Sequence, residues 1–186
     1  MNWHNSKKKR MKEIYLIRHA KAENFSEGLS DFERSVKKKG FKDIQTIGSY
    51  LALQGISPDA ILSSCAMRAQ ESAVALAERL SFEGVKYFLE ELYYAPCEDV
   101  FNIIMAQEKS CEKLFIIGHN PQLNELTNLL SKEFISKIPT MGVVALSFDI
   151  DDWSEIATIK GNLNFFIYPK QFEYYMPRQI RTTLSL

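Results

Sequence analysis

Four side chains that could do chemistry follow short apolar runs. Arg18 and His19 stand directly after "IYLI", His119 stands directly after "LFIIG", and Arg68 comes shortly after "AILSS". A neutral imidazole can act as a nucleophile near pH 7, and a guanidinium binds carboxylates or phosphates through paired N–H donors. A single charged residue at a strand end is usually a solvated cap. Three separate strand ends that carry such residues favour a functional site.

The apolar runs predict the strands that must position these side chains. They are short, continuous and bounded by turn residues, which is typical of buried strands in a parallel sheet. Helical periodicity fills the stretches between them. We predict strands at 14–17, 60–64, 114–117, 143–148 and 163–168, and helices at about 37–54, 68–80, 99–107 and from Asn120 onward. The alternation predicts an α/β fold, a three-layer sandwich with a mostly parallel central sheet flanked by helices.

Three residues are expected to mark helix ends. Gly55 follows the first helical pattern and should end that helix, because glycine readily adopts the left-handed conformation found there. Asn120 is expected to cap the helix after the fourth apolar stretch, with Pro121 at its first position.

The predicted topology brings the four chemical side chains together. Parallel strands place their carboxyl ends at one edge of the sheet, and open α/β sheets bind ligands there. We therefore expect Arg18, His19, Arg68 and His119 to converge at this edge. Two guanidinium groups, two imidazoles and two nearby helix N-termini form an anion site that suits a phosphoryl group best.

Composition limits the class of protein. Basic and acidic residues number 23 each, and this zero formal net charge argues against nucleic-acid or membrane binding by bulk electrostatics. No apolar run approaches the roughly 20 residues of a membrane-spanning helix, and none forms a signal peptide. Three cysteines without a C-x-x-C pair fit free thiols, so we expect a cytoplasmic protein.

The chain shows no internal repeat and no linker between domains. We predict one domain over residues 13–172, preceded by a flexible basic tail (1–12) that contains "KKKRMK". Residues 173–186 have no clear pattern and are expected to form a C-terminal tail.

An ordered series of motifs resembles the histidine phosphatase superfamily, whose fold is phosphoglycerate-mutase-like. The signature of that family is an Arg-His pair after the first strand, followed by a later arginine and a second histidine. Arg18-His19, Arg68 and His119 match these positions. The resemblance covers about residues 13–172.

Other motifs are similar to the SixA-type phosphohistidine phosphatase branch. "LIRHAKA" has alanine rather than glycine after the histidine, as that branch does. "DFERSVKKKG" and "SSCAMRAQESA" match two further patterns, with Val36 where the branch has leucine and Ser72 where it has threonine. "ELYYA", "IIGHNP", "IPTMGVVAL" and "YPKQF" follow in the order of the family.

The resemblance implies a role for each of the four residues. His19 would attack phosphorus in line, and water would hydrolyse the resulting phosphohistidine. Arg18 and Arg68 would neutralise the equatorial oxygens, while His119 would donate a hydrogen bond as charge shifts in the transition state. Since the arginines supply the positive charge, we expect neither a metal ion nor a cofactor.

Two further side chains keep two interpretations each. Arg34 matches the family pattern, and it either contacts substrate or forms a structural ion pair with Asp31 or another neighbour. Larger members of the family use a carboxylate to protonate an alkoxide leaving group, and Glu90 and Glu91 are the nearest candidates here. An imidazole, with a conjugate-acid pKa near ~6.5, leaves readily without such help. Glu91 is therefore either a helping acid or a structural residue.

The expected substrate is a phosphohistidine on a protein, and the alternative is a small phosphate ester. A phosphate-dependent binding module without turnover could use the same pocket, although it would not need His19. A mutase must enclose its substrate, and the chain lacks the long insertions by which larger relatives do so.

Two other phosphatase motifs are imitated but incomplete. "VVALSFDIDDW" resembles an aspartate-nucleophile motif but lacks the threonine or valine expected at Trp153. We therefore predict that its three aspartates, Asp149, Asp151 and Asp152, form a hairpin turn between two strands. Cys65 and Arg68 are spaced C-x-x-R, whereas a cysteine phosphatase needs five residues between them.

Overall fold

The structure, a computed structural model, describes residues 11–25, 27, 28 and 30–175. Its centre is a six-stranded sheet with the order β3-β2-β4-β1-β5-β6. The strands are β1 (Met11–Arg18), β2 (Ala60–Ser64), β3 (Lys86–Leu89), β4 (Lys113–Gly118), β5 (Val143–Asp149) and β6 (Asn162–Ile167). Strand β5 runs antiparallel to both of its neighbours, and the pairs among β1 to β4 are parallel. The predicted mostly parallel sheet is confirmed.

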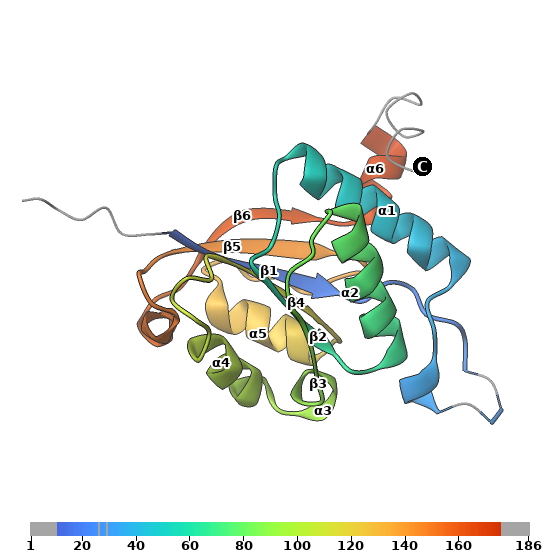
Figure 1. The fold of residues 1–186 in the computed structure, drawn as a ribbon, viewed down its shortest axis with the longest axis horizontal. Helices are drawn as coiled ribbons and strands as arrows, with labels where there is room; N and C mark the ends of the chain where they lie inside the picture. The colour runs from blue at the N-terminus through green and yellow to red at the C-terminus, as the bar shows by residue number, and fades with distance from the viewer. Residues whose placement is uncertain (1–10, 26, 29, 176–186) are drawn as a thin grey trace, which may run out of the picture.

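Helices cover both faces of this sheet, as predicted. They are η1 (Asp31–Glu33), α1 (Lys38–Leu53), α2 (Met67–Arg79), α3 (Glu91–Tyr94), α4 (Cys97–Met105), α5 (Gln122–Leu130), η2 (Trp153–Thr158) and α6 (Pro169–Tyr175). Figure 1 shows α1 and α2 side by side over one face, with α6 next to α1. Helices α4 and α5 pack on the other face.

The two faces of β1 are both buried, which explains its continuous apolar run. Ile14 and Leu16 pack against the layer of α4 and α5, whereas Tyr15 and Ile17 pack against α1 and α2. All four residues are at most 2% exposed. A strand that is covered on both sides needs apolar residues at every position rather than at alternate ones.

The helix-end predictions have different outcomes. The prediction for Gly55 is confirmed, since α1 ends at Leu53 and Gly55 adopts a φ of 66°. The prediction for Asn120 and Pro121 is wrong, because α5 begins at Gln122. The Asn120 amide instead donates to the carbonyl of Ile138 at 3.1 Å, so a tertiary contact has taken the side chain that local capping would have used.

The expected hairpin turn near Asp149 is a longer connection. Strands β5 and β6 do pair antiparallel, but η2 lies between them. Trp153 begins η2 and is fully buried, with its indole N–H donating to the carbonyl of Cys111 at 2.8 Å. The Asp152 carboxylate accepts a bond from the Ser154 amide at 3.0 Å and caps η2. Burial of Trp153 requires a connection wider than a tight turn.

The chain ends differ slightly from the predicted boundaries. Strand β1 starts at Met11, and Lys12, expected in the tail, is fully buried with its ammonium donating to the carbonyls of Lys109 and Cys111. Helix α6 extends to Tyr175, beyond the expected end of the domain. The remaining parts of both predicted tails, 1–10 and 176–186, lie outside the described residues, and the domain assignment stays a prediction. None of the described helices is long and apolar enough to span a bilayer.

Candidate active site

Strand register brings the two histidines side by side. Ile17 is paired with Ile117, so His19 and His119 each follow the end of a neighbouring strand at the same level. The amide of His19 donates to the carbonyl of Gly118 at 3.1 Å, and the centroids of the two imidazole rings are 4.8 Å apart. Because Arg18 and Gly118 are partners in this register, the next residue after each strand is a histidine, and the two form a pair at the carboxyl edge of the sheet.

His19 has a defined tautomer. Its Nδ1 lies 2.7 Å from the carbonyl oxygen of Ala20, and since a carbonyl can only accept, Nδ1 carries the hydrogen. The other ring nitrogen, Nε2, then carries no hydrogen, and its lone pair accepts a hydrogen bond from Nε of Arg68 at 3.4 Å. The backbone thus orients the imidazole with its nucleophilic atom toward the guanidinium.

Arg68 is the centre of the site's hydrogen bonds. It is 6% exposed and lies in the first turn of α2. Its Nη2 lies 3.3 Å from Nδ1 of His119, in addition to the contact of its Nε with His19. Ser72 on the next turn links α2 to the loop that follows His19, because its hydroxyl accepts from the Ala20 amide at 2.9 Å and donates to the Arg68 carbonyl at 2.6 Å.

Asp31 reaches the same guanidinium from the loop before α1. Its carboxylate accepts from Nη2 of Arg68 at 2.8 Å and its main-chain carbonyl accepts from Nη1 at 2.5 Å. The hydroxyl of Tyr93 donates to the same carboxylate oxygen at 3.2 Å. The centroid of the Tyr93 ring lies 5.5 Å from the centroid of the His119 ring. The sequence predicts Asp31 only as a partner of Arg34, and the structure adds its contact with Arg68. The position of Asp31 at the start of the D-x-x-R motif is the sequence signal that could have pointed to the site.

Arg34 and Glu91 lie at the periphery. Arg34 donates to the Asp31 carboxylate and to the carbonyl of Glu23, which is the structural ion pair considered in the sequence, although Asp31 also connects it to Arg68. Glu91 begins α3 and is exposed. Among the described residues, no hydrogen bond or ion pair joins its carboxylate to Arg18, His19, Arg68 or His119.

Arg18 retains an unused donor. Its Nη1 donates to the carbonyl of Ile138 at 2.9 Å, which fixes the side chain, but its Nε is buried and has no partner within the described part of the chain. The amide oxygen of Asn120, which bonds to the same carbonyl through its nitrogen, is also buried without a partner there. Buried polar atoms are almost always bonded, so these two mark a place where a polar ligand group can bind.

Both histidines are neutral at pH 7. Burial lowers the pKa of His19 to about 4, with the charges of Arg68 and Arg18 acting in the same direction and the bond to Ala20 opposing them. Burial, followed by the proximity of His19 and Arg68, lowers the pKa of His119 to about 3. His119 Nε2 lies 2.8 Å from the hydroxyl of Ser64. Since Arg68 can only donate to Nδ1, the hydrogen of neutral His119 is on Nε2 and is donated to Ser64.

The site is suited to an anion and shows no clustered metal ligands. Within the described ranges, there is no group of three or more histidine, cysteine, aspartate or glutamate side chains that could hold a metal ion. The three cysteines, Cys65, Cys97 and Cys111, are unpaired. Two guanidinium groups beside an unprotonated imidazole nitrogen can bind a phosphoryl group and attack it.

Comparison with known proteins identifies the family. The sequence profile of the histidine phosphatase superfamily (branch 1) matches residues 14–124, and the chain belongs to this superfamily. Members of the superfamily are phosphatases.

Solved structures with the same fold include SixA proteins. A candidate phosphohistidine phosphatase SixA from Agrobacterium tumefaciens is 27% identical, with a TM-score of 0.72 over 85% of this chain and 98% of that one. The protein histidine phosphatase SixA in complex with tungstate is 18% identical, with a TM-score of 0.76 over 86% and 99%. A mycobacterial glucosyl-3-phosphoglycerate phosphatase is 14% identical, with a TM-score of 0.61 over 83% and 98%. These similarities confirm the phosphoglycerate-mutase-like fold.

Proposed function

We propose that this chain is a metal-independent phosphatase that works through a covalent phosphohistidine on His19, and that its substrate is a phosphohistidine on a protein. The observation that carries the proposal is the orientation of His19. Its Nδ1–H is held by the Ala20 carbonyl, and its Nε2 lone pair faces the guanidinium of Arg68. A nucleophile therefore points at the group that would bind the phosphoryl oxygens.

The lowered pKa of His19 favours this role. An imidazolium has no lone pair to offer, and with a pKa of about 4 the ring is neutral, with Nε2 free of hydrogen, throughout the neutral pH range. The burial and the arginine charges that lower the pKa thus keep the nucleophile ready, and the same arginines attract the dianionic phosphoryl group.

The reaction would proceed in two displacements. In the first, Nε2 of His19 forms a bond to phosphorus while the bond from phosphorus to the leaving group breaks, and the leaving group takes the electron pair and then a proton from solvent water. In the second, the oxygen of a water molecule forms a bond to phosphorus while the bond from phosphorus to Nε2 breaks and a proton of the water is released to solvent. Inorganic phosphate leaves, and neutral His19 is regenerated. Arg18 and Arg68 would hold the equatorial oxygens in both steps, with the unpartnered Nε of Arg18 as one donor.

His119 would need to change its bonding to assist. Its hydrogen is donated to Ser64, and its Nδ1 accepts from Arg68 in the free site. A phosphoryl dianion opposes the arginine charges and favours the imidazolium. Protonated on Nδ1, His119 would then donate to a phosphoryl oxygen.

The choice of phosphohistidine rests on the leaving group and on the likeness to SixA proteins. An imidazole leaving group needs no strong acid. Glu90 and Glu91 are the two carboxylates that the sequence suggests as acids, and Glu91 is exposed. A small phosphate ester is the second candidate, since a solved structure with this fold is named as a glucosyl-3-phosphoglycerate phosphatase.

The test is turnover and trapping. Wild-type protein and His19→Ala are incubated with a phosphohistidine protein and with an aryl phosphate, with His4→Ala as the control for loss of a histidine. We expect wild type and His4→Ala to turn over both substrates and to carry acid-labile phosphate on His19 after rapid quenching without acid. Turnover by His19→Ala at the wild-type rate would overturn the mechanism. Tight phosphate binding by wild type without turnover would identify a binding module instead.

A further inference from the structure

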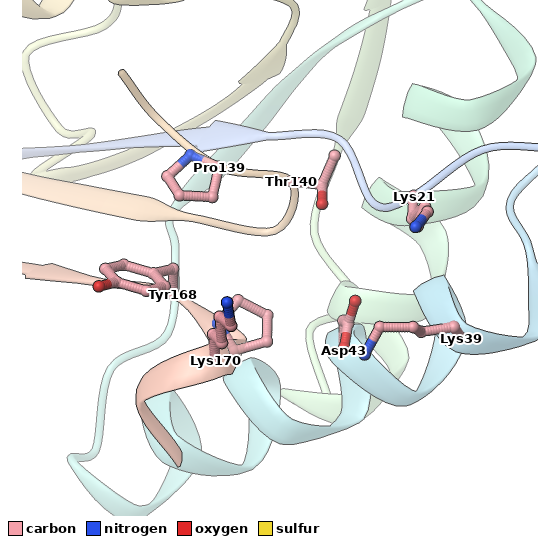
Figure 2. Close-up of a pocket in the computed structure, with 8 residues that line it drawn as sticks. Lys21, Lys39, Asp43, Pro139, Thr140, Tyr168 and Lys170 are labelled. Carbon is pink, nitrogen blue, oxygen red and sulfur yellow. Dashed lines mark ion pairs between the residues drawn. The ribbon is translucent and has the colours of Figure 1, made fainter. Parts of the chain in front are cut away.

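A second, lysine-rich cavity lies beside the candidate active site. It has a volume of about 300 Å³, and two prolines complete its walls. Its polar lining comes from the loop after β1, the first turns of α1, the loop before β5 and the start of α6: Lys21, Lys39, Asp43, Thr140, Tyr168 and Lys170. Figure 2 shows these side chains around a central space, with the Thr140 hydroxyl pointing into it from one side and Lys39 and Asp43 next to each other on another.

The cavity is lined in part by the segment that follows His19 and by the segment that packs against the backbone of Arg18 and His19. Lys21 is two residues after His19, which corresponds to at most about 7 Å along the chain. Thr140 precedes Met141, whose amide donates to the carbonyl of Arg18 at 3.0 Å and approaches that of His19 at 3.3 Å. The cavity therefore adjoins the segment that carries Arg18 and His19.

The cavity carries excess positive charge. Among the described residues, its lining has three lysines, Lys21, Lys39 and Lys170, and one carboxylate, that of Asp43. Asp43 is 8% exposed and lies 3.6 Å from the ammonium of Lys39, so its charge is balanced by that lysine. The chain as a whole has no net charge, and the excess is therefore local.

We propose that this cavity binds a second anionic group of the substrate, a carboxylate or a phosphate, next to the phosphoryl group that is transferred. An ammonium is a compact charge that pairs with either oxyanion, and the hydroxyls of Thr140 and Tyr168 are further donors. The volume admits one such group with a few carbon atoms. The inference rests on the proposed function, because the two anions must belong to one molecule that presents its phosphoryl group to His19.

The protein source of such an anion is an acidic residue close to the phosphohistidine. Its test uses two synthetic peptides that carry phosphohistidine, one flanked by aspartates and one flanked by asparagines. We expect wild type to have a kcat/KM about three- to tenfold higher for the acidic peptide, as expected for one or two partly exposed ion pairs. This preference should fall in the double variant Lys39→Gln/Lys170→Gln, which keeps Lys21 but removes the ammonium that balances Asp43, so that the cavity no longer has an excess of positive charge among its described residues.

The small-molecule source is a second phosphate on a metabolite. Its test compares propane-1,3-diol bisphosphate with the corresponding monophosphate in the same proteins. A preference of wild type for the bisphosphate that is lost in the double variant supports the cavity with a metabolite as substrate. A preference for the acidic peptide, with no preference for the bisphosphate, supports the cavity as an anion site for a protein substrate.

The matched control removes two lysines at the other end of β6. Lys132→Gln/Lys160→Gln makes the same change in net charge, and both residues are exposed near the start of that strand. We expect it to retain the wild-type preference. Equal losses in the control and in the cavity variant, or no preference of wild type in either pair of substrates, would overturn the inference.

Turnover of an aryl phosphate separates this inference from the proposed function. An aryl phosphate has no second anion, so wild type and both double variants should hydrolyse it at equal rates. If wild type hydrolyses none of the substrates, the proposed function fails, and acetylation of Lys39 and Lys170 by an amine reagent then tests the cavity alone. Protection of both amines by the acidic peptide, but not by the neutral one, supports the cavity, and unchanged acetylation contradicts it.

Discussion

The carboxylate of Asp31 lies 2.8 Å from Nη2 of Arg68, the same nitrogen that faces His119 at 3.3 Å. In the free site this carboxylate therefore occupies a donor that a phosphoryl group would need. Arg34 and Arg68 also lower the pKa of Asp31, against the opposing effect of burial, so the group is charged at neutral pH.

The first prediction concerns competition between this carboxylate and a bound anion. Asp31→Asn removes one negative charge and leaves the main-chain carbonyl that holds Nη1 of Arg68. We expect inorganic phosphate to inhibit the variant about three- to tenfold more strongly, the size expected for one charge at a partly exposed position. Glu33→Gln in η1 is the control, since it removes an equal charge from an exposed side chain that bonds only to Ser30 among the described residues. Weaker inhibition of Asp31→Asn would show that Asp31 acts by holding Arg68.

The second prediction concerns Glu91 and the leaving group. Its exposed position and the lack of a bond to the four described site residues favour a structural role. We expect Glu91→Gln to lower kcat/KM by less than about threefold for both a phosphohistidine peptide and an unactivated alkyl phosphate. General acid help is typically worth ~10²–10⁴-fold where the leaving group needs a proton. A loss of that size on the alkyl ester alone would identify Glu91 as the acid.

Most of the sheet could be predicted because burial on both sides leaves a clear signal. Four of the six described strands contain a predicted run and β6 overlaps the fifth, and the four candidate site residues were found because they follow the ends of three of these strands. Strand β3 was missed because it is short: its four residues, Lys86–Leu89, contain an apolar run of only three, which is less than the runs that predicted the other strands.

The contacts of Asp31 could not be predicted from local patterns. It lies 37 residues from Arg68 in the chain, and the path of the loop between β1 and α1 decides whether they meet. The same limit explains Asn120, whose sequence context is a good capping signal. The nearby carbonyl of Ile138 is a tertiary partner that the local sequence does not show.

The third prediction concerns metal ions. Two arginines supply the positive charge at the site, and the described residues include no cluster of metal-ligating side chains. We expect full phosphatase activity after dialysis against EDTA and no increase on addition of Mg²⁺. Activity that disappears in EDTA and returns with Mg²⁺ would contradict the proposed mechanism.

The last prediction concerns stability against pH. The pKa values of His19 and His119 are about 4 and about 3 in the folded state, below the ordinary value of about 6.5 that applies when the chain is unfolded. Between these values the unfolded state binds more protons than the folded state. The free energy of unfolding should therefore decrease as the pH falls from about 6.5 toward 4, and the histidines should contribute no slope above that range.

The size of this effect is up to about 1.4 kcal/mol per pH unit for each histidine. It can be measured by urea denaturation between pH 4.5 and 7.5 in wild type, His119→Gln and His19→Gln/His119→Gln, at a pH step of about half a unit. Carboxylates titrate in the lower part of this range in all three proteins, so their contribution cancels in the difference between slopes. We expect the slope to decrease with each histidine removed, because glutamine does not titrate. Equal slopes in the three proteins would mean that neither histidine is held neutral by its surroundings, and the pre-formed nucleophile would lose its physical basis.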